Sequence, residues 1–208
     1  MTPPTPLIHV VDDDDSFRTA VMRLLRAAGY EVRGYPSAGE FLLTRAADAP
    51  GCVVLDVRMP GPSGPDLPEA LGKRNDTLPI LFLTGHGDIP MSVRAMKAGA
   101  VDFLTKPVER QALLNAVRNA LARDEDNRKA RERDGTLRAR VEALTPRERT
   151  VFTLVVAGKA NKQIAAELGI SERTVKAHRA RVMEKMQVAS LAELVHVADQ
   201  LHAHTPPD

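Results

Sequence analysis

Residues 7–13 read LIHVVDD and residues 52–56 read CVVLD. Each stretch is a short, mainly apolar run that ends in carboxylates, a pattern typical of a buried parallel strand with polar chemistry at its carboxyl end. Apolar runs at 32–35, 80–83 and 101–104 repeat the pattern of short buried segments. We therefore predict five strands and expect the acidic strand ends to lie close together.

Amphipathic, helix-like segments separate these runs, at about 16–28, 38–47, 64–73, 91–98 and 111–123. Regular alternation of short strands and helices is typical of repeated βα units. The predicted fold of this region is α/β, a doubly wound five-stranded parallel sheet. Ligands of such sheets bind beyond the carboxyl ends of the strands.

Composition indicates two ordinary soluble domains. The chain has 208 residues, of which 43% are hydrophobic and 27% charged. It has no apolar run of the roughly 18 to 20 residues that a membrane span needs, and its start lacks a basic region leading into an apolar signal segment. We expect a cytoplasmic protein without a membrane partner. Cys52 is the single cysteine and lies among apolar residues, so we expect a buried structural thiol.

Charges of both signs dominate residues 123–141, RDEDNRKARERDGTLRARV. Such a pattern favours a solvated helix, and the single Gly135 leaves open whether that helix is interrupted. We therefore predict three parts: residues 5–123, a charged helical linker at 124–142, and residues 143–204.

The third part shows four helical segments and no strand pattern. Thr145 and Pro146 form an N-cap and first-turn pair that opens the first helix. A short helix at 161–168, a tight turn at Gly169, and a third helix capped by Ser171 follow, with a fourth helix at 191–201. This is the pattern of a four-helix, all-α helix-turn-helix domain.

The third helix, 172–186, is rich in basic side chains. A basic helix is often only a solvated face, but in a helix-turn-helix it enters the major groove. We expect Lys176 and Ala180 to face bases, and Val175, Val182 and Met183 to pack inward. The full set predicted to contact double-stranded DNA is Lys162, Arg173, Thr174, Lys176, Ala177, Arg179, Ala180 and Arg181. For His178, a phosphate contact and a packing role both stay open.

The acidic strand ends carry the chemistry of the first part. Asp12, Asp13 and Asp56 would repel one another unless a cation compensates, and an all-oxygen cluster suits Mg²⁺. The strands at 80–83 and 101–104 bring Thr84 and Lys106 to the same edge. Each residue alone is commonplace, but together they provide what phosphoryl transfer to a carboxylate requires.

In this interpretation Asp56 is the phosphoacceptor. Asp13 and Asp56 would bind Mg²⁺ directly, Asp12 would orient a metal-bound water, and the backbone carbonyl of Arg58 would complete the set. Lys106 would pair with a phosphoryl oxygen. Asp14 and Asp15 precede a helix, so we interpret them as ordinary capping acids.

The motifs VVDDD, LDVRMPGPSG, LTGHGDIPM and AMKAGAVDFLTKP, followed by the helix-turn-helix, closely resemble response regulators of the NarL/FixJ family. The resemblance covers nearly the whole chain. It implies a flavodoxin-like receiver domain and a LuxR-type DNA-binding domain. It assigns Asp56 as phosphoacceptor, Thr84 as switch hydroxyl and Phe103 as switch aromatic. It also implies a cis peptide bond between Lys106 and Pro107.

The resemblance further implies a transcription regulator rather than an enzyme. Its partners would be a cognate sensor histidine kinase, promoter DNA, RNA polymerase and a second copy of the chain. That copy would pair on phosphorylation through the face at 91–98, 101–105 and 111–123. Val108 departs from the common pattern, since related receivers often carry an aromatic there. Arg58 and Met59 lie beside the acceptor, where the side chains vary within the family. His86 follows Thr84 and is either a solvated loop residue or one that faces the site.

Three other classes of protein would account for parts of this pattern. Phosphatases of the haloacid dehalogenase type carry a second acid two residues after the nucleophile, where this chain has Arg58. A P-loop is excluded because Lys73 and Lys159 are followed by Arg74 and Ala160 rather than serine or threonine. A receiver that serves only as a protein-interaction module would not bind DNA, and salt-dependent duplex binding distinguishes that class.

Overall fold

The computed structural model describes residues 5–46, 48–59, 66–72, 76–85 and 100–203. The chain forms two compact units that divide between Arg128 and Lys129. Each unit has a hydrophobic core of its own.

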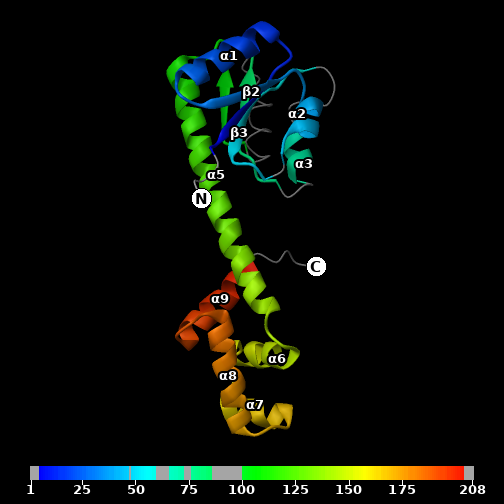
Figure 1. Ribbon diagram of the computed structural model, residues 1–208, viewed down its shortest axis with the longest axis vertical. Helices are drawn as coiled ribbons and strands as arrows, with labels where there is room; N and C mark the ends of the chain where they lie inside the picture. The colour runs from blue at the N-terminus through cyan, green and yellow to red at the C-terminus, as the bar shows by residue number, and fades with distance from the viewer. Residues whose placement is uncertain (1–4, 47, 60–65, 73–75, 86–99, 204–208) are drawn as a thin grey trace. The chain divides into compact units, whose positions relative to one another are not determined.

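A five-stranded parallel sheet forms the centre of the first unit (Figure 1). Its strand order is β2-β1-β3-β4-β5, so the connection changes direction between β1 and β3 and creates a switch point at their carboxyl ends. The predicted fold class is confirmed. Each strand begins and ends within one residue of its predicted apolar run, and these runs are 7–11, 32–35, 52–55, 80–83 and 101–104. The strands are β1 (Leu7–Val11), β2 (Glu31–Tyr35), β3 (Gly51–Asp56), β4 (Ile80–Thr84) and β5 (Asp102–Thr105).

Helices cover both faces of the sheet (Figure 1). Along β3, Val53 and Leu55 pack toward α2 (Ala38–Thr44) and α3 (Asp66–Gly72). Cys52 and Val54 alternate with them and pack toward α1 (Asp15–Ala27) and α5 (Arg110–Glu142). This burial on both faces explains why β3 reads as a continuous apolar run. The predicted helix at 91–98 lies outside the described residues.

Cys52 is fully buried, as expected, and burial raises the pKa of its thiol to about 12. A thiol with so high a pKa carries almost no thiolate at neutral pH and is unreactive.

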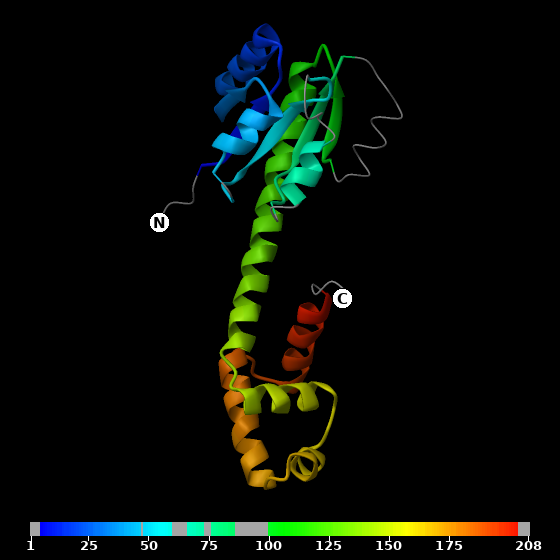
Figure 2. The ribbon, with the colours of Figure 1, turned by 90° about the vertical axis from the view of Figure 1, so that its right-hand side faces the viewer.

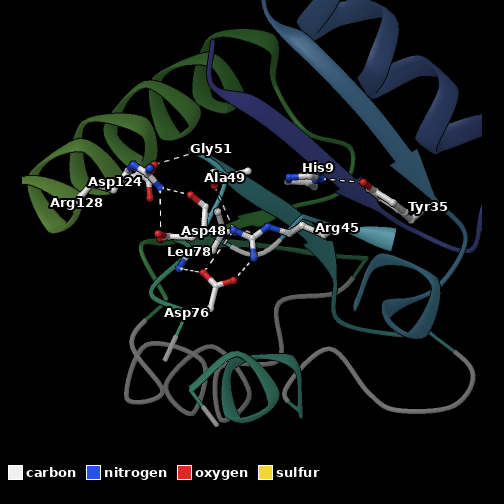
Figure 3. A network of polar contacts seen from close by, with 10 residues as sticks. All are labelled: His9, Tyr35, Arg45, Asp48, Ala49, Gly51, Asp76, Leu78, Asp124 and Arg128. Carbon is white, nitrogen blue, oxygen red and sulfur yellow. Dashed lines mark hydrogen bonds and ion pairs between the residues drawn. The ribbon is translucent and has the colours of Figure 1, made fainter. Parts of the chain in front are cut away.

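A polar network ties the opposite, amino-terminal edge of the sheet to α5 (Figure 3). Asp124 is 4% exposed, and its carboxylate accepts a 3.0 Å hydrogen bond from the backbone N–H of Gly51. A Cβ atom at Gly51 would overlap the carbonyl oxygen of Leu7, so only glycine fits this close strand contact. One turn further along α5, Arg128 donates a 2.6 Å hydrogen bond to the backbone carbonyl of Asp48. The strand that ends in Asp56 is therefore anchored at its other end to α5.

The same network explains where α2 ends. The predicted helix continued to Ala47, but α2 ends at Thr44 because Arg45 is extended, with ψ 132°. The Arg45 guanidinium pairs with Asp76 and donates a hydrogen bond to the backbone carbonyl of Ala49 at 3.2 Å (Figure 3). A long-range ion pair thus overrides the local helix pattern.

The segment that includes the predicted linker is helical throughout. α5 runs for 33 residues and includes Gly135, so the possible interruption there does not occur. A single glycine costs a helix only about 1 kcal/mol relative to alanine, and the flanking Arg, Glu and Leu residues are good helix formers. Neither α5 nor any other helix in the described ranges is both long and apolar enough to cross a membrane.

The second unit is helical, as predicted, with α6 (Pro146–Val156), α7 (Asn161–Leu168), α8 (Glu172–Met186) and α9 (Leu191–Ala203). Figure 2 shows α7 nearly end-on beside α8. Thr145 caps α6 in a capping box with Glu148, and Ser171 caps α8, so both predicted caps are confirmed. Gly169 ends α7 in the left-handed conformation, with φ 65°, and allows the tight turn into α8.

Candidate functional site

Three carboxylates meet at the carboxyl edge of the sheet. Asp12 follows β1 and Asp56 ends β3, and these neighbouring strands bring the two side chains together. Asp12, Asp13 and Asp56 each offer an oxygen, and these oxygens lie within 4.8 Å of one another. Asp12 is fully buried and Asp56 is 6% exposed, whereas Asp13 is open to solvent. The cluster therefore has a buried interior and one exposed side.

Lys106 joins the two buried carboxylates. Its Nζ donates to Asp12 Oδ2 at 2.6 Å and to Asp56 Oδ2 at 2.9 Å. The Lys106 backbone N–H donates to the carbonyl of Thr84 at 2.6 Å, and the following bond to Pro107 is cis, as the family resemblance implied. The turn after β5 thus directs the ammonium into the cluster.

The electrostatics of the site reflect competition between burial and pairing. Burial raises the pKa of Asp12 above its ordinary value, although the hydrogen bonds from Lys106 and from the Asp14 backbone oppose this effect. Burial alone would lower the pKa of Lys106, but its hydrogen bonds to Asp12 and Asp56 outweigh it and raise the pKa. The ammonium therefore remains charged, and the cluster gains from further positive charge.

A hard divalent cation fits this donor set. Three carboxylates within ligand distance of one another, one of them open to solvent, match the preference of such ions for oxygen ligands and retained water. The Arg58 backbone N–H donates to Asp56 Oδ1 at 3.3 Å, so the chain after β3 curls back toward the carboxylate. The predicted metal-binding role of the Arg58 carbonyl stays a prediction.

The two predicted switch residues lie on β4 and β5, the strands that follow β3 in the sheet. Thr84 ends β4 and is 1% exposed. Phe103 is half-buried on β5, opposite Phe82, and packs against the core on the α2 and α3 side. Their switching roles stay predictions, and His86 lies outside the described residues.

Sequence reasoning assigned no role to Phe17, yet its ring lies beside the site. The Lys106 Nζ is 4.2 Å from the centroid of the Phe17 ring. Arg18, the next residue, donates to the backbone carbonyl of Asp12 at 2.6 Å. Asp14 caps α1 and Asp15 lies in its first turn, as predicted. The available sequence signal was position alone, since the first turn after β1 must lie near the carboxyl edge.

The residues predicted to contact DNA lie on and next to α8. Arg179 is half-buried and donates from Nη1 to Asn161 Oδ1 at 2.7 Å, which ties α8 to the start of α7. The others are exposed, and they are Lys162, Arg173, Thr174, Lys176, Ala177, Ala180 and Arg181. The exposed part of α8 therefore presents the predicted basic side chains to solvent.

The inward face of α8 matches its predicted packing. Val175 and Val182 are buried, and Met183 packs partly against the same core. His178 is half-buried, and its Nδ1 has no hydrogen-bond partner among the described residues. On α9, Leu194 is buried in this core while Leu191 is 45% exposed.

Comparison with known proteins finds a family match for each of the two parts of the chain. Residues 8–118 match the response regulator receiver domain, and residues 142–198 match the luxR family of bacterial regulatory proteins. The chain belongs to the response regulator family. This response regulator combines a receiver with a LuxR-type DNA-binding domain, an organisation found in transcription regulators.

Relatives of this response regulator extend over nearly its whole length. It is 49% identical to nodulation protein W of Bradyrhizobium diazoefficiens over 195 residues, which cover 94% of this chain and 86% of that protein. The solved structure of the response regulator StyR is 50% identical with a TM-score of 0.82, covering 94% of this chain and 99% of StyR. Full-length FixJ from B. japonicum is 42% identical with a TM-score of 0.59, covering 97% and 100%.

Proposed function

We propose that this response regulator is a transcription factor whose DNA binding is switched by phosphorylation of Asp56. The observation that carries the proposal is the Lys106 ammonium, which bridges Asp12 and Asp56 at the carboxyl edge of the sheet. A carboxylate nucleophile beside a fixed cation is the arrangement that phosphoryl transfer requires.

The donor in this proposal is a phosphohistidine of a cognate sensor histidine kinase. An Asp56 carboxylate oxygen attacks the phosphorus, an O–P bond forms, and the P–N bond breaks as its electron pair returns to the imidazole. Lys106 exchanges its contact with Asp56 for one with a phosphoryl oxygen and neutralises charge there. Hydrolysis by water later restores the carboxylate and releases inorganic phosphate.

Asp12, Asp13 and Asp56, with the Arg58 carbonyl, would hold Mg²⁺, which when bound neutralises charge on the phosphoryl oxygens. Asp12 is the most buried of the three carboxylates, so its part is to keep the buried side of the site negative and to orient water.

Phosphorylation would be transmitted through Thr84 and Phe103. The Thr84 hydroxyl moves toward the phosphoryl group, and Phe103 turns into the space that it leaves. Thr84 ends β4 and Phe103 lies on β5, and the predicted pairing face comprises residues 91–98, 101–105 and 111–123. We propose that this face pairs two receivers after phosphorylation. Residues 91–98 lie outside the described part of the chain.

In the second unit, α8 would enter the major groove of promoter DNA. Exposed Lys176 and Ala180 would face bases, while Lys162, Arg173 and Thr174 would hold the backbone. A dimer would read two half-sites roughly one helical turn apart. RNA polymerase is the remaining proposed partner.

The proposed parts are the receiver at 5–123, the linker at 124–142 and the DNA-binding domain at 143–204. The setting is the cytoplasm, where the kinase, the promoter and RNA polymerase are accessible. The chain acts here as a regulator and not as an enzyme, because its single phosphoryl group modifies the chain itself.

Promoter binding tests the proposal directly. Genomic fragments bound by the full chain are mapped with and without beryllofluoride and Mg²⁺, for the wild type, Asp56→Asn and the matched control Asp126→Asn. Asp126 is an exposed carboxylate on α5. We expect beryllofluoride to increase binding for the wild type and Asp126→Asn but not for Asp56→Asn. Equal binding in all conditions would refute the switch.

Salt dependence separates a DNA-binding protein from a receiver that only recruits other proteins. Counterion release makes the logarithm of the DNA affinity fall linearly with the logarithm of salt concentration. Duplex affinity too weak to measure even at low salt would favour the interaction module.

A further inference from the structure

An aromatic ring on α1 lies beside the lysine that bridges the two buried carboxylates. The Phe17 ring centroid lies 4.2 Å from the Lys106 Nζ. A cation within about 6 Å of a ring centroid is attracted by the negative face of the ring. The same ammonium donates to Asp12 and Asp56, so one lysine contacts two carboxylates and one ring.

The position of Phe17 is set by the acids before it. Asp14 caps α1 and accepts a 3.0 Å hydrogen bond from the Phe17 backbone N–H. The Asp14 backbone in turn donates to Asp12 Oδ1 at 2.9 Å, and Arg18 donates to the Asp12 carbonyl. The first turn of α1 is therefore tied to the residue that binds Lys106.

Packing alone does not require an aromatic ring here. Phe17 is half-buried at the border of the core on the α1 and α5 side, where Leu24 from the same helix also packs. A leucine would fill such a border position. What a leucine lacks is the negative ring face, which matters because the Lys106 side chain is only 17% exposed and its ammonium has lost much of its water.

We propose that Phe17 is a positioning residue for phosphoryl transfer: its ring holds the Lys106 ammonium at the site through a cation–π contact. The inference rests on the proposed function. A lysine side chain has four rotatable bonds, and its contact with Asp56 must be exchanged for one with the phosphoryl group. The ring keeps the ammonium in place during that exchange.

Phosphorylation by acetyl phosphate measures this effect, because a small donor forms no protein–protein interface that a change at Phe17 could disturb. An Asp56 oxygen forms the new O–P bond while the P–O bond to acetate breaks, and acetate leaves with the electron pair. Lys106 balances the charge on the phosphoryl oxygens as they transfer. Loss of the ring should therefore slow this step.

The experiment replaces Phe17 in the full chain by mono-, di- and trifluorophenylalanine and by leucine. Fluorine removes negative charge from the ring face with little change of shape, so the phosphorylation rate should fall at each step. We expect a total loss of roughly three- to ten-fold, the range for a partly desolvated cation–π contact. The rate is read from the phosphorylated fraction on phosphate-affinity gels.

The matched control is Leu24→Ala, two turns further along the same face of α1, which reduces packing against the same core but should leave the rate unchanged. A flat fluorination series, or an equal loss for Leu24→Ala, would overturn the inference. Failure of the wild-type chain to become phosphorylated on Asp56 would instead overturn the proposed function.

Discussion

His9 makes the receiver sensitive to acid in a way that can be calculated. It lies in β1, is 1% exposed, and its Nδ1 is 3.0 Å from the Tyr35 hydroxyl. Its Nε2 is buried and has no hydrogen-bond partner within the described ranges. The ring also packs edge-on against Phe41, with the centroids 5.1 Å apart. Neither the Tyr35 hydroxyl nor the Phe41 ring carries a negative charge that would compensate a protonated imidazole.

Burial is the main cause, with the nearby Arg45 and Arg33 guanidinium groups acting in the same direction, and together they lower the pKa of His9 from 6.5 to about 4. The unfolded chain therefore takes up a proton at a higher pH than the folded chain. The contribution of the neutral His9 imidazole to the free energy of unfolding is complete above pH 6.5. It is lost as the pH falls toward 4. Linkage gives a loss of about 2 kcal/mol by pH 5 and about 3 kcal/mol by pH 4.

Urea unfolding followed by tyrosine fluorescence measures this loss. The chain has no tryptophan and two tyrosines, Tyr30 and Tyr35, both in the first unit, so the signal reports that unit alone. We compare the wild type with His9→Asn, which keeps a polar group near the Tyr35 hydroxyl but cannot titrate. Tyr35→Phe is the control that keeps the imidazole.

Carboxylates also titrate in this pH range, so the difference between the variants is what tests the prediction. Between pH 7 and pH 5 the free energy of unfolding of the wild type and of Tyr35→Phe should fall by about 2 kcal/mol more than that of His9→Asn. If His9→Asn loses as much stability as the wild type, the buried neutral imidazole is not the cause and the reasoning is wrong.

Three further predictions concern the other sites. Lys176→Ala should weaken specific operator binding by about 1–3 kcal/mol in titrations, whereas the exposed receiver variant Arg23→Ala, outside the proposed pairing face, should not. The hydrogen bond from Lys185 is the main reason that the pKa of Glu148 is lowered to about 2, so α6 should lose stability as the pH falls from 4.5 toward 2. Hydrogen exchange of α6 should show a smaller loss for Glu148→Gln. Asp124→Ala leaves a buried backbone N–H of β3 without its acceptor and should cost the receiver about 1–3 kcal/mol in urea unfolding, against no change for Asp126→Asn.

Much of the receiver was predictable because its signals are local. Strand β3 reads as an apolar run since both of its faces are buried, and Asp56 was readable as a site residue because ligands of such sheets bind at the carboxyl ends of the strands. Helix caps such as Asp14 and Ser171 were equally readable, since a cap depends on the next two or three residues.

Local patterns failed where distant partners decided the structure. The α2 pattern continued to Ala47, but the pairing of Arg45 with Asp76 ends the helix at Thr44.

At Gly135 the local pattern left open whether the helix is interrupted. The helix-forming residues around this glycine keep α5 continuous.

By itself, the sequence determined the strands, the caps, the edge of the sheet that carries the acids, and the basic helix of the second unit. Periodicity and capping depend on neighbours along the chain, so these features can be read in one dimension. Only the tertiary structure decided the contacts of Lys106, which meets Asp12 from 94 residues away and lies against the ring of Phe17. Such contacts depend on strand order, register and side-chain direction together, which no local pattern encodes.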